Sequence, residues 1–164
     1  MTNAEPRPTS YLDTLLLYYE EEIMGEAYFY GLSNHFDGPG EKEKLNLLAE
    51  VERHAAKAVK PLLEKHGLVS RTEAELQSIG KRDVEQHAGW DWNALITDMS
   101  VRYPDYLVEF DSLEKMAPDD DLAPLQFLTE HEVVAIEFAN KELAGDADSA
   151  EPLRRYLATE PPQV

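Results

Sequence analysis

Apolar side chains recur at intervals of three and four residues in four long stretches of the chain, which is the spacing of one face of an α-helix. The first stretch follows the candidate N-cap Ser10 and runs from 11 to about 34, and the second runs from 45 to about 66. The third starts near 90 and continues to 116, and the fourth runs from 122 to about 143. We therefore predict four long helices.

The connections between these helices differ in length. A short turn with two glycines and a proline, at 35–40, joins the first two helices. A connection of about 22 residues, at 68–89, joins the second to the third and contains a candidate short helix at 72–79. A connection of this length in a compact domain is typical of a crossover that runs the length of a bundle. The acidic run at 119–121 is expected to be a solvated turn, and a further short helix is predicted at 152–158.

Two prolines interrupt the helical patterns. Pro61 lies inside the second predicted helix, where a kink or an earlier end is expected, and Pro104 lies in the middle of the third, which we expect to be kinked there. No stretch of four to eight residues alternates in the manner of a strand between turn signals, so the chain is predicted to be all-α. A length of 164 residues suits one hydrophobic core.

The domain organisation that follows is simple. We predict a single helical-bundle domain over 11–160, preceded by a flexible N-terminal segment at 1–10 and followed by a flexible tail at 161–164. No internal repeat is present.

The charge of the chain limits its partners. It contains 33 Asp and Glu against 15 Lys and Arg, a formal net charge of −18. A negative surface repels phosphate backbones and anionic lipid headgroups, so neither nucleic acid nor a membrane is an expected partner. Such acidity is usually a matter of solubility, but acidic side chains can also be neutralised by bound cations.

The absence of cysteine limits the chemistry further. Disulfides, thiolate nucleophiles, zinc fingers and iron–sulfur clusters all require cysteine, so any bound metal must use oxygen and imidazole ligands. The first ten residues contain two prolines and no apolar run, so neither a signal peptide nor a transmembrane segment is predicted. We expect a cytoplasmic location.

Acidic and histidine side chains fall on the apolar faces of the predicted helices. On the first helix the apolar face passes through Glu22 and Glu26, whereas Glu20 and Glu21 lie on the opposite arc and are expected to face water. On the second helix an apolar line passes through Glu50 and His54, one turn apart. The third helix offers Glu109, and the fourth offers His131 and Glu132.

A buried carboxylate without a partner costs several kcal/mol, so acids that point inward from four helices require a compensating cation or proton. A metal ion is the simplest answer. The other histidines, His35, His66 and His87, lie in or beside predicted loops and are expected at the surface. Four tyrosines could take part in redox or proton transfer beside such a metal, but aromatic residues at helical spacing more often pack in a core, so no catalytic role is assigned to Tyr28, Tyr30, Tyr103 or Tyr106.

This arrangement resembles the ferritin-like di-metal carboxylate superfamily, which includes ferritins, rubrerythrins and di-iron oxygenases. The family pattern is one Glu on the first helix, Glu-x-x-His on the second, one Glu on the third and Glu-x-x-His on the fourth. The resemblance covers 11–143 and implies a ferritin-like four-helix bundle with a long crossover between the second and third helices, followed by the short C-terminal helix. It assigns metal-binding roles to Glu26, Glu50, His54, Glu109, and Glu132 or His131.

The chain departs from the family pattern on two helices. Val51 stands three residues before His54, so the second-helix pair has the spacing i,i+4, and Ala135 stands where the fourth-helix histidine is expected. A dinuclear site, a single metal ion and a site without metal therefore all stay open.

Three functions are compatible with these residues. Carboxylates and imidazole suit iron or manganese, so the first hypothesis is a non-haem oxidoreductase that activates O2 or peroxide, with a small-molecule substrate as a further partner. The second is an iron-binding storage protein of the same fold. The third is a metal-free helical module that acts in stress or binds a partner protein. We expect a homo-oligomer, and first of all a dimer.

Overall fold

The computed structural model of the protein describes residues 7–164, and all regular elements in that range are helical. The all-α class predicted above is thereby confirmed. The first six residues of the predicted N-terminal segment 1–10 lie outside the described residues. The α-helices are α1 (Tyr11–Ser33), α2 (Pro39–Lys65), α3 (Glu73–Asp83), α4 (Trp92–Arg102), α5 (Pro104–Met116), α6 (Leu122–Leu143) and α7 (Glu151–Ala158), with short 3₁₀ turns η1 (Val84–Gln86) and η2 (Asp119–Asp121).

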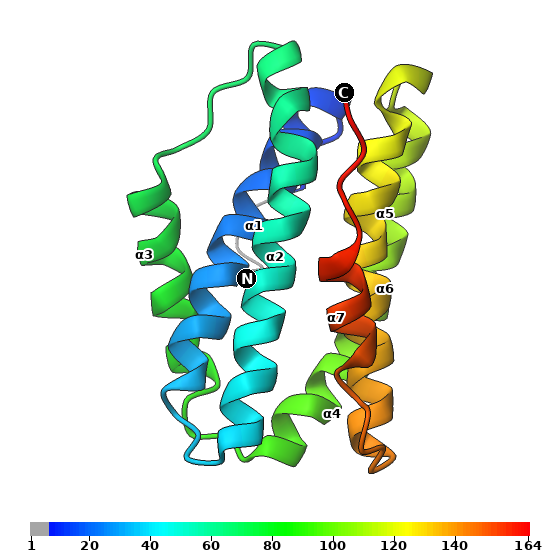
Figure 1. The fold of residues 1–164 in the computed structure, drawn as a ribbon. Coiled ribbons are helices and arrows are strands. Elements are labelled where there is room, and N and C mark those ends of the chain that lie inside the picture. Colours follow the sequence, from blue (N-terminus) through cyan, green and yellow to red (C-terminus); the bar gives the residue numbers. More distant parts are fainter. Residues whose placement is uncertain (1–6) are drawn as a thin grey trace.

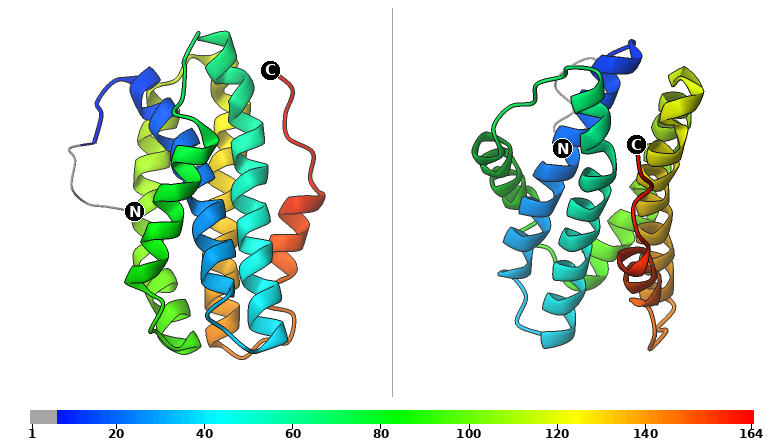
Figure 2. Two further views of the ribbon diagram at one scale, coloured as in Figure 1. Left: turned by 90° about the vertical axis from the view of Figure 1, so that its left-hand side faces the viewer. Right: turned by 45° about the horizontal axis from the view of Figure 1, so that its top comes forward.

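Two antiparallel helix pairs, α1 with α2 and α5 with α6, surround the main core (Figure 1). The pairs meet where α1 contacts α5 and where α2 contacts α6. The segment after α2 returns the chain to the opposite end of the molecule, and its helix α3 packs along the outer side of α1 (Figure 2). Helix α7 contacts both α2 and α6 and so covers the line along which these two helices meet.

Side-chain caps fix the first residue of several helices. The hydroxyl of Ser10 accepts a hydrogen bond from the backbone N–H of Asp13 at 3.2 Å, and Asp91 caps α4 in the same way. Thr72 and Glu75 form a reciprocal capping box at the start of α3. These bonds satisfy backbone donors that have no partner inside a helix.

The two helix-breaking prolines act differently. At Pro104 the predicted kink is a complete break, because α4 ends at Arg102 and α5 begins with Pro104 in its first turn, where a missing N–H costs nothing. Pro61 lies inside α2 without ending it.

Helix α3 extends beyond its predicted end at 79. It continues through Gly80 to Asp83, and at Gly80 α3 approaches the backbone of α1 closely. A Cβ atom at Gly80 would lie 2.1 Å from the carbonyl oxygen of Met24. The glycine therefore reports a close helix contact and not a helix end.

Helix α6 is held at both ends by carboxylates. At its start the fully buried Asp121 accepts bonds from Tyr11 (2.7 Å) and Lys65 (2.5 Å), and its Oδ2 lies 2.7 Å from His66 Nε2. At its end Glu142 accepts hydrogen bonds from three donors: Lys44 at 2.7 Å, Trp92 at 3.0 Å and Ser149 at 2.5 Å. Asp121 and His66 thus take part in packing, which corrects the prediction of a solvated turn and a surface histidine.

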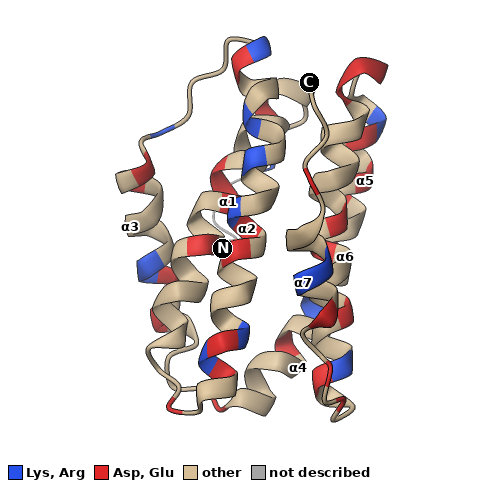
Figure 3. Cartoon of the chain, viewed as in Figure 1, with Lys and Arg blue, Asp and Glu red and all other residues tan. Residues whose placement is uncertain are grey.

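Charged residues are spread along all the helices of the bundle. Figure 3 shows acidic residues along the length of the bundle, with basic residues interspersed. Among the described residues, no helix is long and apolar enough to cross a membrane.

Candidate metal centre

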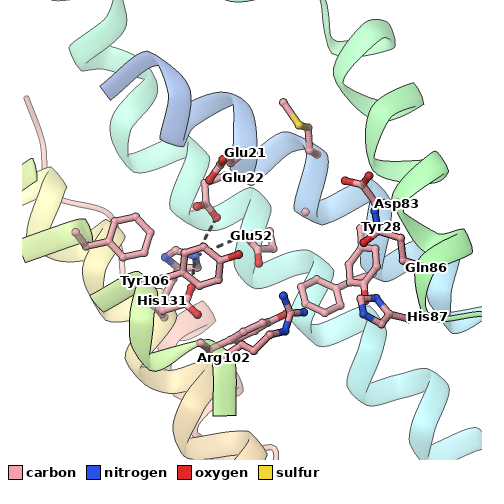
Figure 4. Close-up of a pocket in the computed structure, with 16 residues that line it drawn as sticks. Glu21, Glu22, Tyr28, Glu52, Asp83, Gln86, His87, Arg102, Tyr106 and His131 are labelled. Atoms are coloured by element: carbon pink, nitrogen blue, oxygen red, sulfur yellow. Dashed lines mark hydrogen bonds and ion pairs between the residues drawn. The ribbon is translucent and has the colours of Figure 1, made fainter. Parts of the chain in front are cut away.

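Three helices bring carboxylates and an imidazole together inside the bundle. Glu22 of α1, Glu52 of α2 and His131 of α6 each offer one ligand atom, and these atoms all lie within 4.8 Å of one another (Figure 4). Nε2 of His131 lies 2.9 Å from Glu22 Oε2 and 3.5 Å from Glu52 Oε2. It also lies 3.5 Å from Oε2 of the neighbouring Glu132. We call these four residues the carboxylate–histidine cluster.

Each of the three glutamates in the cluster belongs to a line of residues spaced alternately by three and four positions along its helix. Such a line forms the helix face that packs in the interior of a bundle. Nearly all the other residues on these lines are buried and apolar, so the helices that bury them also bury the acids. The lines are Leu15, Tyr18, Glu22, Gly25, Phe29 and Leu32 on α1; Leu45, Leu48, Glu52, Ala55, Val59 and Leu62 on α2; and Leu125, Leu128, Glu132, Ala135 and Ala139 on α6.

Burial of the cluster is nearly complete. The side chains of His131, Glu22 and Glu132 retain 2%, 5% and 8% of their exposure, and that of Glu52 retains 16%. Within the cluster, Glu22 Oε2 and Glu132 Oε1 are buried oxygens without a hydrogen-bond partner. The approach of Glu22 Oε2 to His131 Nε2, at 2.9 Å, is an ion-pair contact.

The orientation of His131 is fixed from its other side. Its Nδ1 donates a hydrogen bond to the backbone carbonyl oxygen of Leu128. Because a carbonyl oxygen can only accept, Nδ1 carries the proton. In the neutral ring the lone pair of Nε2 then points at the carboxylates. A backbone carbonyl that holds one ring nitrogen while the other faces the ligand set is the usual arrangement of a metal-binding histidine.

The environment shifts the protonation of the cluster. Burial raises the pKa of Glu22 well above its usual value, and the charge of Glu52 raises it further. Burial also raises the pKa of Glu132 to about 8, with His131 opposing and Glu52 adding to the shift. Burial lowers the pKa of His131, but the two carboxylates outweigh burial and raise it well above 6.5. Burial would raise the pKa of Glu52 as well, but contacts with Glu22 and His131 outweigh it and lower that pKa. Without a cation, the cluster therefore retains protons.

A narrow cavity of about 60 Å³ adjoins the cluster. Its lining includes all four cluster residues and also Tyr28, His87 and Arg102 (Figure 4). A water molecule needs roughly 10–15 Å³ of such space, so the cavity has room for a few waters or one very small molecule. Aromatic side chains form much of the remaining lining, namely Phe29, Tyr103, Tyr106 and Phe110.

Three of the residues proposed from the sequence lie away from this cluster. Glu26 forms a bidentate ion pair with Arg53, at 2.7 and 2.8 Å. Glu50 is exposed, which corrects the expectation that it faces the interior. His54 is half-buried under the C-terminal segment, where its Nε2 lies 2.8 Å from the carbonyl oxygen of Thr159.

The remaining proposed residues divide between two places. Glu109 lies 3.3 Å from Arg7, in the segment before α1, and it is absent from the cavity lining. His131 and Glu132 both belong to the cluster, so the structure does not force a choice between them. The acids expected to face water do not: Glu20 is buried and paired with Arg71 at 2.6 Å, and Glu21, 11% exposed, lines the cavity.

Glu52 is the cluster residue that the sequence reasoning missed. The apolar line predicted for the second helix passes through Glu50, which is exposed, and His54, which is half-buried. A line started at Leu45 and continued in alternating steps of three and four reaches Glu52 directly and leaves Glu50 outside. The signal was therefore present in the sequence.

Comparisons with known proteins do not add to this picture. No protein-family model matches the chain, and no curated protein and no solved structure matches it either. The fold and the cluster define the class by themselves: an all-helical protein with a buried carboxylate–histidine cluster beside a narrow cavity.

Proposed function

We propose that this chain is a ferritin-like, metal-dependent oxidoreductase in which Glu22, Glu52 and His131 bind one iron or manganese ion, and that the adjoining cavity admits O2 or peroxide. The observation that carries this proposal is the convergence of one ligand atom each from Glu22, Glu52 and His131 within 4.8 Å of one another, with Glu22 Oε2 buried and without a hydrogen-bond partner. A buried polar atom without a partner costs about 1–3 kcal/mol, and a cation between these atoms would remove that cost.

The order of the helices supports the ferritin-like part of the proposal. An antiparallel pair, a long crossover and a second antiparallel pair follow one another along the chain (Figure 1). The family pattern has a glutamate on the first helix and Glu-x-x-His on the second and fourth. Glu22, Glu52 and Glu132 would take three of its four glutamate positions, and Ala55 and Ala135 would then stand at its two histidine positions.

The number of donors favours one metal ion over two. Replacement of both pattern histidines leaves His131 as the imidazole of the cluster, and on the third helix of the pattern Glu109 is turned away toward Arg7. Three carboxylates and one imidazole are enough ligands for one ion of the iron or manganese type, whereas the family's dinuclear sites use four carboxylates and two imidazoles.

The chain's own residues would take distinct roles around that ion. Glu22 and Glu52 would neutralise its charge, and His131, held by the Leu128 carbonyl, would present Nε2 in a fixed direction. Glu132 would complete the set or hold a proton beside the cavity. Iron or manganese bound there would supply the one-electron steps that O2 and peroxide require.

The direct test is metal content. Protein purified without chelator and loaded with Fe(II) or Mn(II) without oxygen is expected to bind close to one ion per chain, measured by elemental analysis after gel filtration. Glu22→Gln and Glu52→Gln should each remove most of it. Glu50→Gln is the matched control, because Glu50 is an exposed acid on the same helix as Glu52. Equal metal content in the wild type and in all three variants would contradict a metal site formed by Glu22 and Glu52.

A metal-free helical module is the second candidate, and one observation favours it. The raised pKa of His131 and of Glu132 allows protons to compensate the cluster without any metal. In that case loaded protein would contain less than a tenth of an ion per chain. Its thermal melting would also be unchanged by added Fe(II) or Mn(II).

A further inference from the structure

A tyrosine and a histidine form a hydrogen-bonded pair at the cavity, apart from the cluster. The hydroxyl of Tyr28 on α1 lies 2.9 Å from Nδ1 of His87, which follows η1 (Figure 4). Both side chains line the cavity that the carboxylate–histidine cluster also lines. His87 has little exposure, 13% of its side chain, so it is not the surface histidine expected from the sequence.

The direction of this hydrogen bond follows from the state of both partners. Burial raises the pKa of the Tyr28 phenol, which keeps its proton and donates it. Burial lowers the pKa of His87. The charge of Asp98 opposes this shift and the charge of Arg102 adds to it, and the imidazole is neutral. A neutral imidazole that accepts at Nδ1 carries its proton at Nε2.

The groups around His87 can accept the charge that a second proton would bring. Its Nε2 lies 4.0 Å from Oδ2 of Asp98, and the charge of Asp83 acts in the same direction. Arg102 opposes them, but its guanidinium is held by Asp98 through three contacts of 2.6 to 2.9 Å. The imidazolium form of His87 would therefore face a carboxylate.

Tyr103 lines the same cavity as this pair and the cluster. The pKa of its buried phenol is raised by burial, by the charge of Tyr28 and by the charges of Glu132 and Glu52. Its hydroxyl is therefore within electrostatic reach of both groups. The pair and the cluster thus border the same cavity.

We propose that Tyr28 is a redox-active tyrosine: it gives up one electron, and its hydroxyl proton passes at the same time to Nδ1 of His87. The O–H bond of the phenol breaks and an N–H bond forms on the imidazole. The products are a neutral phenoxyl radical and an imidazolium, and the electron goes to a one-electron oxidant. In the working protein that oxidant would derive from O2 or peroxide at the metal centre, so this source rests on the proposed function.

The geometry explains why Tyr28 would be oxidised more readily than a tyrosine without a hydrogen-bonded base. A phenol that loses an electron becomes a strong acid, and a base already in hydrogen-bond contact takes its proton without rearrangement. Tyr30 on the same helix offers a contrast. It is 42% exposed and forms no hydrogen bond through its hydroxyl to any residue that the structure describes.

The test uses an external oxidant on metal-free protein, so that it does not depend on the proposed metal chemistry. A flash oxidises tris(bipyridine)ruthenium(II) in the presence of persulfate, and electron paramagnetic resonance of rapidly frozen samples measures tyrosyl radical. Wild type, Tyr28→Phe, Tyr30→Phe and His87→Gln are compared, with far-ultraviolet circular dichroism to confirm folding. Radical formation is also timed in H2O and in D2O by transient absorption.

We expect Tyr28→Phe to lose most of the radical and Tyr30→Phe to retain it. His87→Gln should slow radical formation roughly a hundredfold, the scale of a lost positioned proton acceptor, and should abolish the H2O/D2O difference. A radical yield in Tyr28→Phe equal to that of wild type would overturn the proposal. An unchanged isotope effect in His87→Gln would also overturn it.

A second arm separates this inference from the proposed function. Fe(II)-loaded wild type is treated with hydrogen peroxide, and the same radical is sought. If the flash experiment succeeds and this one yields no radical, the redox pair stands and the metal centre is not its oxidant. If the flash experiment fails in the way described above, the pair is refuted whatever the metal does.

Discussion

The carboxylate of Glu52 lies directly against Gly25 of the neighbouring helix. A Cβ atom at Gly25 would approach Cδ of Glu52 to 3.0 Å and Oε2 to 3.1 Å. The absence of a side chain at this point of α1 therefore gives Glu52 the room it occupies in the cluster, and this contact can be changed without removing any ligand.

Gly25→Ala is expected to weaken Fe(II) or Mn(II) binding roughly tenfold, because the added methyl group pushes the Glu52 carboxylate away from His131. The helix itself should be retained, since alanine is the better helix former. Gly40→Ala in α2 is the control, because nothing lies within 4 Å of a Cβ there. Isothermal titration under exclusion of oxygen measures both affinities, and equal values in the two variants would contradict the placement of Glu52.

The buried carboxylate of Asp121 predicts an acid-sensitive contribution to stability. Burial would raise the pKa of Asp121, but bonds from Lys65, Tyr11 and His66 outweigh burial and lower it below 3.8. Its stabilisation is therefore complete above the unfolded pKa and is lost as the pH falls through the lower folded value. Asp121→Asn should cost roughly 2–3 kcal/mol at neutral pH and progressively less below pH 4.

Urea unfolding from pH 3 to 7 measures this difference. Asp120→Asn, at an exposed position of the same turn, should change the free energy of unfolding by less than about 0.5 kcal/mol. If the two variants lose equal stability at neutral pH, the role of Asp121 is refuted.

The raised pKa of Glu132 predicts the opposite dependence on pH for metal-free protein. Its ordinary pKa is 4.5 and its folded pKa about 8, so its contribution to stability is complete below pH 4.5 and is lost as the pH rises to about 8. A bound cation favours the ionised carboxylate and reverses this loss. Metal-free and metal-loaded proteins should therefore differ most in melting temperature near pH 8 and least near pH 4.5.

Thermal melting with and without Mn(II) across this range checks the expectation. Glu132→Gln should remove most of the pH dependence of the metal-free protein, whereas Glu50→Gln should not. Melting curves that coincide with and without metal at every pH would speak against a cation in the cluster.

The contact between α3 and α1 yields a prediction about packing. Gly80→Ala would place a Cβ 2.1 Å from the carbonyl oxygen of Met24, so the two helix backbones must separate. We expect a loss of roughly 2 kcal/mol in the free energy of unfolding, more than the gain in helix propensity can offset. Gly89→Ala, where a Cβ would meet nothing within 4 Å, should be nearly neutral. Chemical denaturation compares them, and a stable Gly80→Ala variant would contradict the close approach.

Periodicity was sufficient to place α6, whose predicted bounds coincide with the observed ones. It was less reliable for choosing among neighbouring acids, because a helix that is apolar over a wide arc allows several lines. Glu26 and Glu22 both lie near the apolar face of α1, and what separates them is Arg53, which comes from another helix and pairs with Glu26. Ion pairs between helices cannot be deduced from the spacing along one helix.

The same reason explains why the surroundings of His87 and His54 could not be predicted from the sequence. His87 was expected at the surface because its sequence neighbourhood is polar, but the crossover segment turns it against Tyr28. His54 lies on a half-buried face whose cover, the C-terminal segment at Thr159, is 105 positions away in the sequence. Contacts of this kind belong to the tertiary structure and leave no periodic signal.

The two carboxylates at the ends of α6 also fix the number of residues that can lie between them. Asp121 is paired with Lys65 and Glu142 with Lys44, and both lysines belong to α2, so neither helix can slide along the other without breaking one of these pairs. One residue inserted between Asp121 and His131 would turn the two parts of α6 against each other by about 100°. Either the lysine pair or the position of His131 would then be lost. Changes of length along this chain should therefore be tolerated in its turns and not between the two anchors of α6.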